Sequence, residues 1–195
     1  MKNFKQFIVF TIGLIIFGFG ISFGNKSLLG GNPMSILVVG MSLNLPLSVG
    51  TCNLILSFIE TGIGYTLDKT NVTLATVFGA VCGSYAIDLA NLFIPDTTSL
   101  TIRVIYMLVG IVLYCFGLAL QQASRSGYGN LDCFIFGLKK VFKVEKYHRV
   151  RWCTDIGFII SGVLLGGTFG IGTVILLLVG GIIIEFFRKQ IEKVY

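Results

Sequence analysis

Long stretches without a charged residue are the feature that most constrains this chain. Residues 7–24 carry no charge, and neither do residues 27–59. A helix that crosses the hydrocarbon core of a bilayer needs about 20 mostly apolar residues. Hydrophobic residues make up 54% of the chain, charged residues make up 12%, and the mean hydropathy is +0.88. A chain with so few charges cannot cover its surface as a soluble enzyme or a disordered tail does, so we expect an integral membrane protein built of helices.

Turn signals divide the apolar stretches into full spans and shorter pieces. Glycine, asparagine and proline cluster at residues 30–33 and 44–46, and a glycine-rich hairpin is expected at residues 166–170. The six expected spans are residues 7–24, 47–65, 73–93, 102–121, and two within 150–187 on either side of the hairpin. The two remaining apolar segments, residues 34–43 and 131–142, are too short to cross.

The two halves of the chain resemble each other at an offset of about 97 residues. The matching positions include Gly31-Asn32 with Gly129-Asn130 and Asp88 with Glu185, and Cys52 matches Cys153 after a four-residue insertion near the basic loop. Each half is then a span, a short segment and two further spans. Because three spans is an odd number, the second half enters the membrane from the opposite side. We therefore expect an all-α, polytopic, single transmembrane domain over residues 1–195. It consists of two inverted three-helix repeats, about 5–95 and 100–190, each with a short broken or re-entrant helix.

The distribution of basic residues gives an independent test of this layout. If both termini are cytoplasmic, thirteen of the 15 lysines and arginines lie on the cytoplasmic side, and only Lys26 and Arg103 lie outside. That asymmetry is the positive-inside bias of multi-pass membrane proteins. The net charge of +6 therefore indicates cytoplasmic loops, not a nucleic-acid partner. The basic loop at residues 139–151 is a candidate site for anionic lipid.

Asparagine precedes or begins each short segment, and this pattern has two interpretations. A half-helix at membrane depth must be buried in protein or face a water-filled cavity, and its N-terminus favours an anionic ligand group. Asn32 and Asn130, together with Asp132, would then line a central substrate site. In the alternative interpretation, the two asparagines only cap helices that lie in the membrane interface.

Several acidic residues lie within or beside the expected spans, where charge is costly. Glu60 is the deepest and is a candidate for coupling to a proton or a cation, although an interfacial hydrogen bond would also explain it. Asp88 and Glu185 occupy equivalent positions in the two halves and are further coupling or gating candidates. Glu185 precedes Arg188 by three residues, a spacing that permits a structural ion pair.

Arg151 and Asp155 are four residues apart and share one helix face. Their pair could gate the protein or simply hold the basic loop against the bundle. With one histidine, five scattered cysteines and none of the common catalytic motifs, we expect no catalytic residue, no metal and no cofactor.

Two motifs in the second half match a known family. Residues 129–138 (GNLDCFIFGL), followed by Arg149, Asp155 and the glycine-rich residues 166–173, resemble the YczE/YyaS/YitT family of bacterial integral membrane proteins. Residues 18–20 and 30–33 fit the same pattern in the first half. The resemblance implies functional weight for an acid at Asp132, an arginine at Arg149 or Arg151, and an acid at Asp155. The sequence departs from the family pattern at Met34, where many members have an aromatic residue. The soluble C-terminal domain of the longer YitT-like members is also absent from it.

The resemblance implies a location, the bacterial cytoplasmic membrane, but no substrate. We expect a small-solute transporter or permease with both termini in the cytoplasm and with the lipid bilayer and a small solute as partners. A membrane scaffold or accessory subunit that binds a partner or anionic lipid is the main alternative, and a small-solute pore is another. The sequence leaves open whether a second copy of the chain is also a partner.

Overall fold

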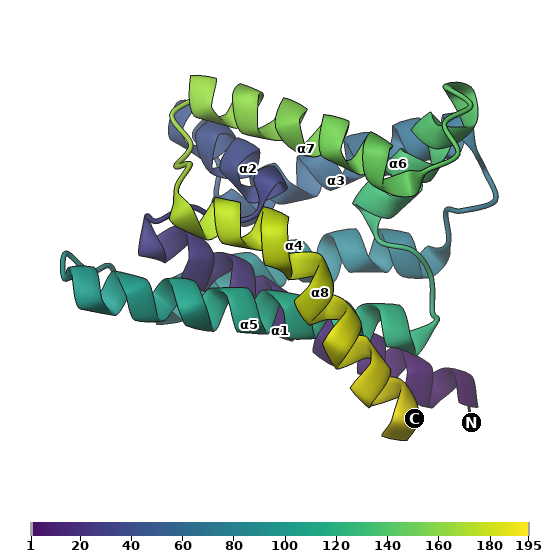
Figure 1. The fold of residues 1–195 in the computed structure, drawn as a ribbon, viewed down its shortest axis with the longest axis horizontal. Coiled ribbons are helices and arrows are strands. Elements are labelled where there is room, and N and C mark those ends of the chain that lie inside the picture. The colour runs from purple at the N-terminus through teal and green to yellow at the C-terminus, as the bar shows by residue number, and fades with distance from the viewer. Residues whose placement is uncertain (1, 195) are drawn as a thin grey trace.

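The computed structural model describes the backbone of residues 2–194 and the side chains of residues 5–147 and 149–193. This part of the chain forms helices joined by loops and contains no strand (Figure 1). The helices, in chain order, are α1 (Lys2–Ser27), α2 (Pro33–Asn44), α3 (Val49–Leu67), α4 (Leu74–Phe93), α5 (Leu100–Ser124), α6 (Asn130–Val141), α7 (Tyr147–Leu164) and α8 (Ile171–Val194).

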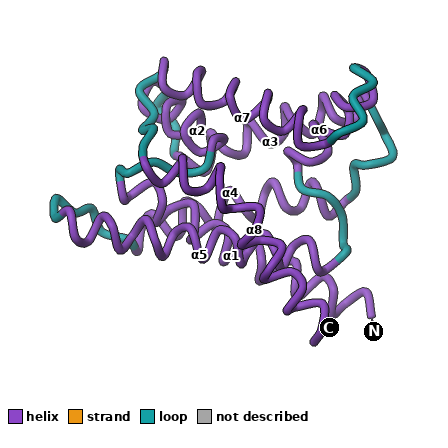
Figure 2. Tube along the Cα trace, in the orientation of Figure 1, coloured by secondary structure: helices purple, strands orange, loops and turns teal. Residues whose placement is uncertain are grey.

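The all-α prediction is confirmed, and each expected span or short segment corresponds to one helix. Gly30, with φ +94°, lies in the turn between α1 and α2, and Gly166, with φ +89°, lies in the hairpin between α7 and α8. These are backbone conformations that glycine adopts at little cost. The loops therefore fall at the predicted turns (Figure 2).

Four helices of the described chain, α1, α4, α5 and α8, are long and apolar enough to cross a membrane. The expected count of six spans is thus not confirmed. α3 and α7 are long enough, with 19 and 18 residues, but each contains several polar side chains. In α3 these include the buried Asn53, Ser57 and Glu60. Several of the residues that lower the hydropathy of α3 are therefore interior ones.

The helices form two groups. In Figure 1, α2, α3, α6 and α7 lie above, while α1, α5 and α8 lie below with α4 behind. α1 packs against α5 and α4, and α8 packs against α5. Each short helix packs against a helix of the other half of the chain, α2 against α7 and α6 against α3. The two halves are thus joined through both short helices.

Glycine allows the closest of these contacts. A Cβ atom on Gly20 of α1 would lie 2.3 Å from the backbone nitrogen of Tyr114 in α5. One on Gly162 of α7 would lie 2.5 Å from the backbone nitrogen of Leu37 in α2. Close backbone approach of this kind is how helices associate in lipid, where the hydrophobic effect does not drive them together.

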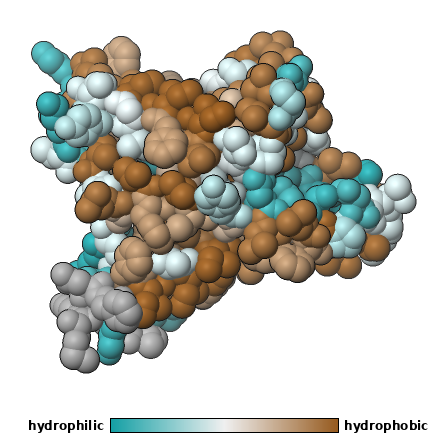
Figure 3. Space-filling view, turned by 180° about the vertical axis from the view of Figure 1, so that it is seen from behind, coloured by the Kyte–Doolittle hydropathy of each residue, from teal (hydrophilic) through white to brown (hydrophobic). Residues whose placement is uncertain are grey.

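Much of the outer surface is apolar. Figure 3 shows apolar side chains over much of the face seen from behind, with a band of hydrophilic residues that runs from the middle of the view to its right side. Leu74, Leu92 and Leu164 are each more than four-fifths exposed. An apolar exterior of this extent matches a surface that faces lipid rather than water.

Candidate functional site

A cavity of about 400 Å³ is lined by the N-terminal residues of both short helices. Asn32 and Ser35 line it from the start of α2, and Asn130 and Asp132 line it from the start of α6. The three predicted substrate-binding residues, which are far apart in sequence, therefore border one space. Each of the two short helices packs against a helix of the other half, α2 against α7 and α6 against α3.

The first residues of α2 account for some of the free backbone N–H groups at its own N-terminus. The side-chain oxygen of Asn32 accepts a hydrogen bond from the backbone N–H of Ser35 at 2.9 Å, and Pro33 occupies the first turn. Pro33 has no N–H to satisfy, and Asn32 satisfies one of the others. Asn32 is therefore a helix cap, as one of the two interpretations of the sequence predicted, and it also lines the cavity.

The N-terminus of α6 is built differently. Gly129 is its cap residue and makes no side-chain capping bond. Asn130 instead donates from Nδ2 to Oγ1 of Thr61 at 2.8 Å, and it lies 3.4 Å from the carbonyl oxygen of Thr76. Asn130 thus links α6 to α3 and α4 and does not cap its own helix.

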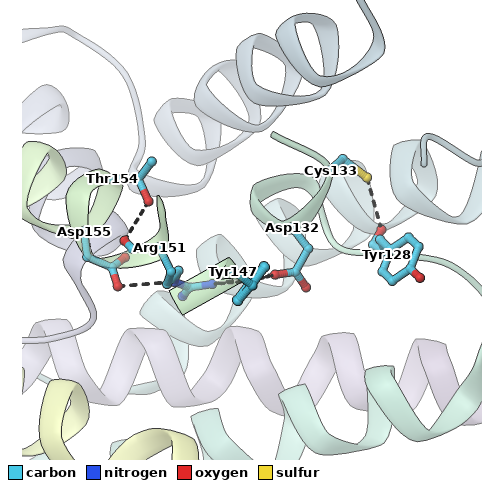
Figure 4. Close-up of polar contacts among 7 residues, drawn as sticks. All are labelled: Tyr128, Asp132, Cys133, Tyr147, Arg151, Thr154 and Asp155. Atoms are coloured by element: carbon cyan, nitrogen blue, oxygen red, sulfur yellow. Dashed lines mark hydrogen bonds and ion pairs between the residues drawn. The ribbon is translucent and has the colours of Figure 1, made fainter. Parts of the chain in front are cut away.

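A chain of polar contacts extends along one side of the cavity (Figure 4). The hydroxyl of Tyr147 hydrogen-bonds to Oδ1 of Asp132, and Nη1 of Arg151 lies 3.4 Å from that hydroxyl. Arg151 also forms ion pairs with Asp132 at 3.7 Å and with Asp155 at 3.2 Å. One guanidinium therefore lies between two carboxylates, one on α6 and one on its own helix.

The sequence predicted that Arg151 ends the basic loop. In the structure Arg151 instead lies within α7. α7 begins at Tyr147, and the loop between α6 and α7 is shorter than the predicted loop at residues 139–151. Tyr147, Arg151 and Asp155 recur every four residues and so share one helix face. Sequence reasoning recognised only the last two, although the same spacing would have pointed to the tyrosine.

Glu60 of α3 borders the same cavity and is only 2% exposed. Neither of its carboxylate oxygens has a hydrogen-bond partner among the described residues. A buried carboxyl group without a partner carries a large desolvation cost unless a proton, a cation or a polar ligand group meets it. Glu60 therefore lacks, among the described residues, the hydrogen bond that the alternative interpretation would give it.

The remaining two predicted residues lie outside the polar chain. Asp88 does not line the cavity but accepts hydrogen bonds from Oγ of Ser48 at 2.5 Å and from the backbone N–H of Gly50 at 2.7 Å. It therefore holds the N-terminus of α3, where a negative charge is favourable. Glu185 borders the cavity, but it pairs with Arg188 at 2.6 Å and with Lys189 at 3.6 Å, and the predicted structural ion pair is present.

Another ion pair lies where α3 ends. Nζ of Lys140 is 3.1 Å from Oδ1 of Asp68, which also accepts a hydrogen bond from Oγ1 of Thr70 at 2.8 Å. The hydrogen bond from Thr70, together with the contact from Lys140, lowers the pKa of the Asp68 carboxyl group. The side chain of Lys140 is 62% exposed, so solvent screens this pair and it fastens the end of α6 to α3 only weakly.

Comparison with known proteins finds relatives along nearly the whole chain. The family described as "Family of unknown function (DUF6198)" matches residues 4–189. An uncharacterized protein of Haemophilus influenzae is 27% identical over 98% of this chain and 87% of its own. The uncharacterized protein YyaS of Bacillus subtilis is 25% identical over 96% of this chain and 94% of its own.

A third relative is named as a membrane protein. The uncharacterized membrane protein YczE of Bacillus subtilis is 22% identical over 91% of this chain and 83% of its own. The resemblance to YczE and YyaS found in the sequence motifs is therefore confirmed. No solved structure matches the chain.

Proposed function

The chain belongs to the DUF6198 family of unknown function, and from its cavity we propose that it is a secondary transporter or permease for a small solute. The observation that carries this proposal is one cavity, inside a largely apolar helical protein, that is lined by the N-terminal residues of both α2 and α6 and by several charged side chains. Half-helices that end at a central cavity are a recurrent design of solute transporters. The proposal requires no catalytic chemistry and no cofactor.

The order of the helices supports an origin in two inverted repeats. In each half a long helix is followed by a helix of 12 residues and then by two longer helices. The contacts also correspond, since α1 packs on α4 as α5 packs on α8, and α2 packs on α7 as α6 packs on α3. In this proposal α3 and α7 complete the six spans, and both termini lie on the cytoplasmic side of the bacterial membrane.

One difference between the halves supports alternating access. α3 packs against α4, whereas α7 and α8 share no comparable interface within the described chain. Two repeats that adopt different arrangements can exchange them, and the exchange would open the cavity first to one side and then to the other. Asn32, Asn130 and Asp132 would contact the solute, Glu60 would carry the coupling proton, and the pair of Arg151 with Asp155 would respond to solute at Asp132.

The proposal is tested by flux through the purified chain in proteoliposomes. The vesicles are incubated with a defined pool of small metabolites and their contents are identified by mass spectrometry. We expect at least one solute to enter above the level in empty vesicles, and we expect Asp132→Asn and Glu60→Gln to reduce its entry. Glu192→Gln, at an exposed position on α8 outside the cavity, is the control. Flux that is unchanged in both cavity variants would remove these roles, and no flux of any solute would contradict the proposal.

A second candidate function is membrane or partner binding through the short loop after α6. Phe142 is 68% exposed there, beside the exposed residues Lys143 and Lys146. An exposed aromatic residue next to lysines is typical of contact with an anionic lipid surface, to which each lysine contributes about 1 kcal/mol. Retention of vesicle binding without any solute flux would favour this function over transport.

A further inference from the structure

We infer that the cavity binds a small organic cation with N–H donors, and that Glu60 is its principal partner. The inference rests on the proposed function only in taking the cavity as the ligand site. It goes further in naming the chemical class that the cavity would accept. The carboxylates, the helix termini and the apolar walls of the cavity each contribute to it.

The charge around the cavity favours a cation. Glu60, Asp132 and Asp155 line it together with a single guanidinium, that of Arg151. Glu185 is balanced by Arg188 and Lys189 outside the cavity wall. Three carboxylates against one guanidinium leave an excess of negative charge when all are ionised.

The two helix N-termini do not reverse this excess. A helix terminus carries a partial charge of about +0.5, so two of them amount to about one positive charge. Asn32 caps α2, and Asp132 lies in the first turn of α6, where its carboxylate offsets the dipole. An anionic ligand group, which the helix termini alone would favour, would therefore meet the carboxylates without a matching positive charge.

The groups left without partners indicate donors on the ligand. Both carboxylate oxygens of Glu60 and Oδ1 of Asp155 lack a hydrogen-bond partner among the described residues. Glu60 and Asp155 are 2% and 6% exposed, and both line the cavity. Among the fully buried side-chain atoms of the described wall, Nε2 of Gln121 is the one donor without a partner. Primary ammonium and guanidinium groups supply the missing donors, whereas a quaternary ammonium group has none.

The rest of the wall suits the organic part of such a ligand. Phe10, Phe17, Tyr114 and Trp152 contribute aromatic surface to the cavity. Aromatic faces attract cations and also bury apolar groups. A volume of about 400 Å³ falls within the range of small-molecule sites and exceeds the needs of a bare metal ion.

The test measures binding of three matched probes to the full chain in lipid nanodiscs, with empty nanodiscs as the background. Benzylammonium has charge and N–H donors, benzyltrimethylammonium has charge without N–H donors, and benzyl alcohol has no charge. We expect benzylammonium to bind most tightly, and we expect Glu60→Gln to weaken its binding by about tenfold, the scale of one charge-assisted hydrogen bond. Glu192→Gln should leave binding unchanged.

Folding and transport are separated from the ligand class in the same preparations. Gln is close in shape to Glu, and the thermal midpoint of Glu60→Gln is measured so that lost binding is not confused with unfolding. Asp155→Asn is the second variant, and it should also weaken the binding of benzylammonium. Equal affinity for benzylammonium and benzyl alcohol, no binding of benzylammonium to the wild type, or unchanged binding in both folded variants would overturn the inference. Glu60-dependent binding without flux would support the ligand class and contradict transport.

Discussion

Asn130, the first residue of α6, donates a hydrogen bond to Thr61 of α3, with 2.8 Å between Nδ2 and Oγ1. Thr61 is buried, with 7% of its surface exposed, and Asn130 is half-buried. The bond joins the second half of the chain to the first beside the cavity. It also fixes the start of a helix whose cap residue, Gly129, has no side chain to do so.

Removing either partner of this bond should lower stability modestly. Hydrogen bonds between membrane helices contribute about 0.6 kcal/mol on average and up to about 1.7 kcal/mol. We expect Asn130→Ala and Thr61→Val each to destabilise the protein, and the double variant to cost less than their sum. The measurement is a double-mutant cycle of thermal unfolding in detergent. Thr66→Val, at an exposed position on the same helix as Thr61, is the control, and strict additivity of the Asn130 and Thr61 substitutions would contradict the bond.

Arg151 should matter more for stability than any single acid it contacts. Arg151→Gln would leave Asp132 and Asp155 without their shared cation, and breaking a buried pair in this way costs about 3 kcal/mol or more. Arg151 is 26% exposed, which places the expected cost at the lower end. The thermal midpoint of the variant in detergent measures the loss.

A second substitution distinguishes the ion pairs from simple packing. In the Arg151→Gln background, Asp155→Asn removes a carboxylate that has lost its partner, so the double variant should regain part of the stability. If the double variant is as unstable as the sum of the two single variants predicts, the ion pairs do not account for the loss.

The contact between α1 and α5 depends on the absence of a side chain at Gly20. An added Cβ would lie 2.3 Å from the backbone nitrogen of Tyr114 and 2.7 Å from its Cα atom, so the helices would have to separate. We expect Gly20→Ala to cost about 1–3 kcal/mol of unfolding free energy. Gly62→Ala is the matched control, because nothing lies within 4 Å of the added atom. Since alanine favours helix, the control should gain about 0.5–1 kcal/mol, and similar losses in both variants would contradict the packing.

The sequence predicted the helices better than it predicted their partners. Hydropathy and turn residues located every helix, because both are local properties of the chain. The contacts of α2 with α7 and of α6 with α3 join segments far apart in sequence, and no periodicity records them. The same is true of the bond from Ser48 to Asp88, which makes Asp88 a helix-capping residue and leaves it outside the cavity.

The candidate site shows the same division. Local signals singled out Asn32, Asn130 and Asp132, the residues at the start of each short helix. The tyrosine that bonds to Asp132 was missed because Tyr147 lies on a different helix and was assigned to a loop. Glu60 was found through its cost in an apolar segment, but its lack of a partner could be seen only in three dimensions.

The antiparallel insertion of the two halves is tested most directly by the sidedness of two exposed loop positions. Thr98 lies in the loop between α4 and α5, and Glu145 lies in the loop between α6 and α7. Each is replaced singly by cysteine in a chain whose five native cysteines have been changed to serine or alanine. Intact cells are then treated with a membrane-impermeant thiol reagent. We expect Thr98→Cys to be labelled from outside and Glu145→Cys to be labelled only after the membrane is opened. Labelling of both positions from the same side would contradict the inverted arrangement and the transport mechanism built on it.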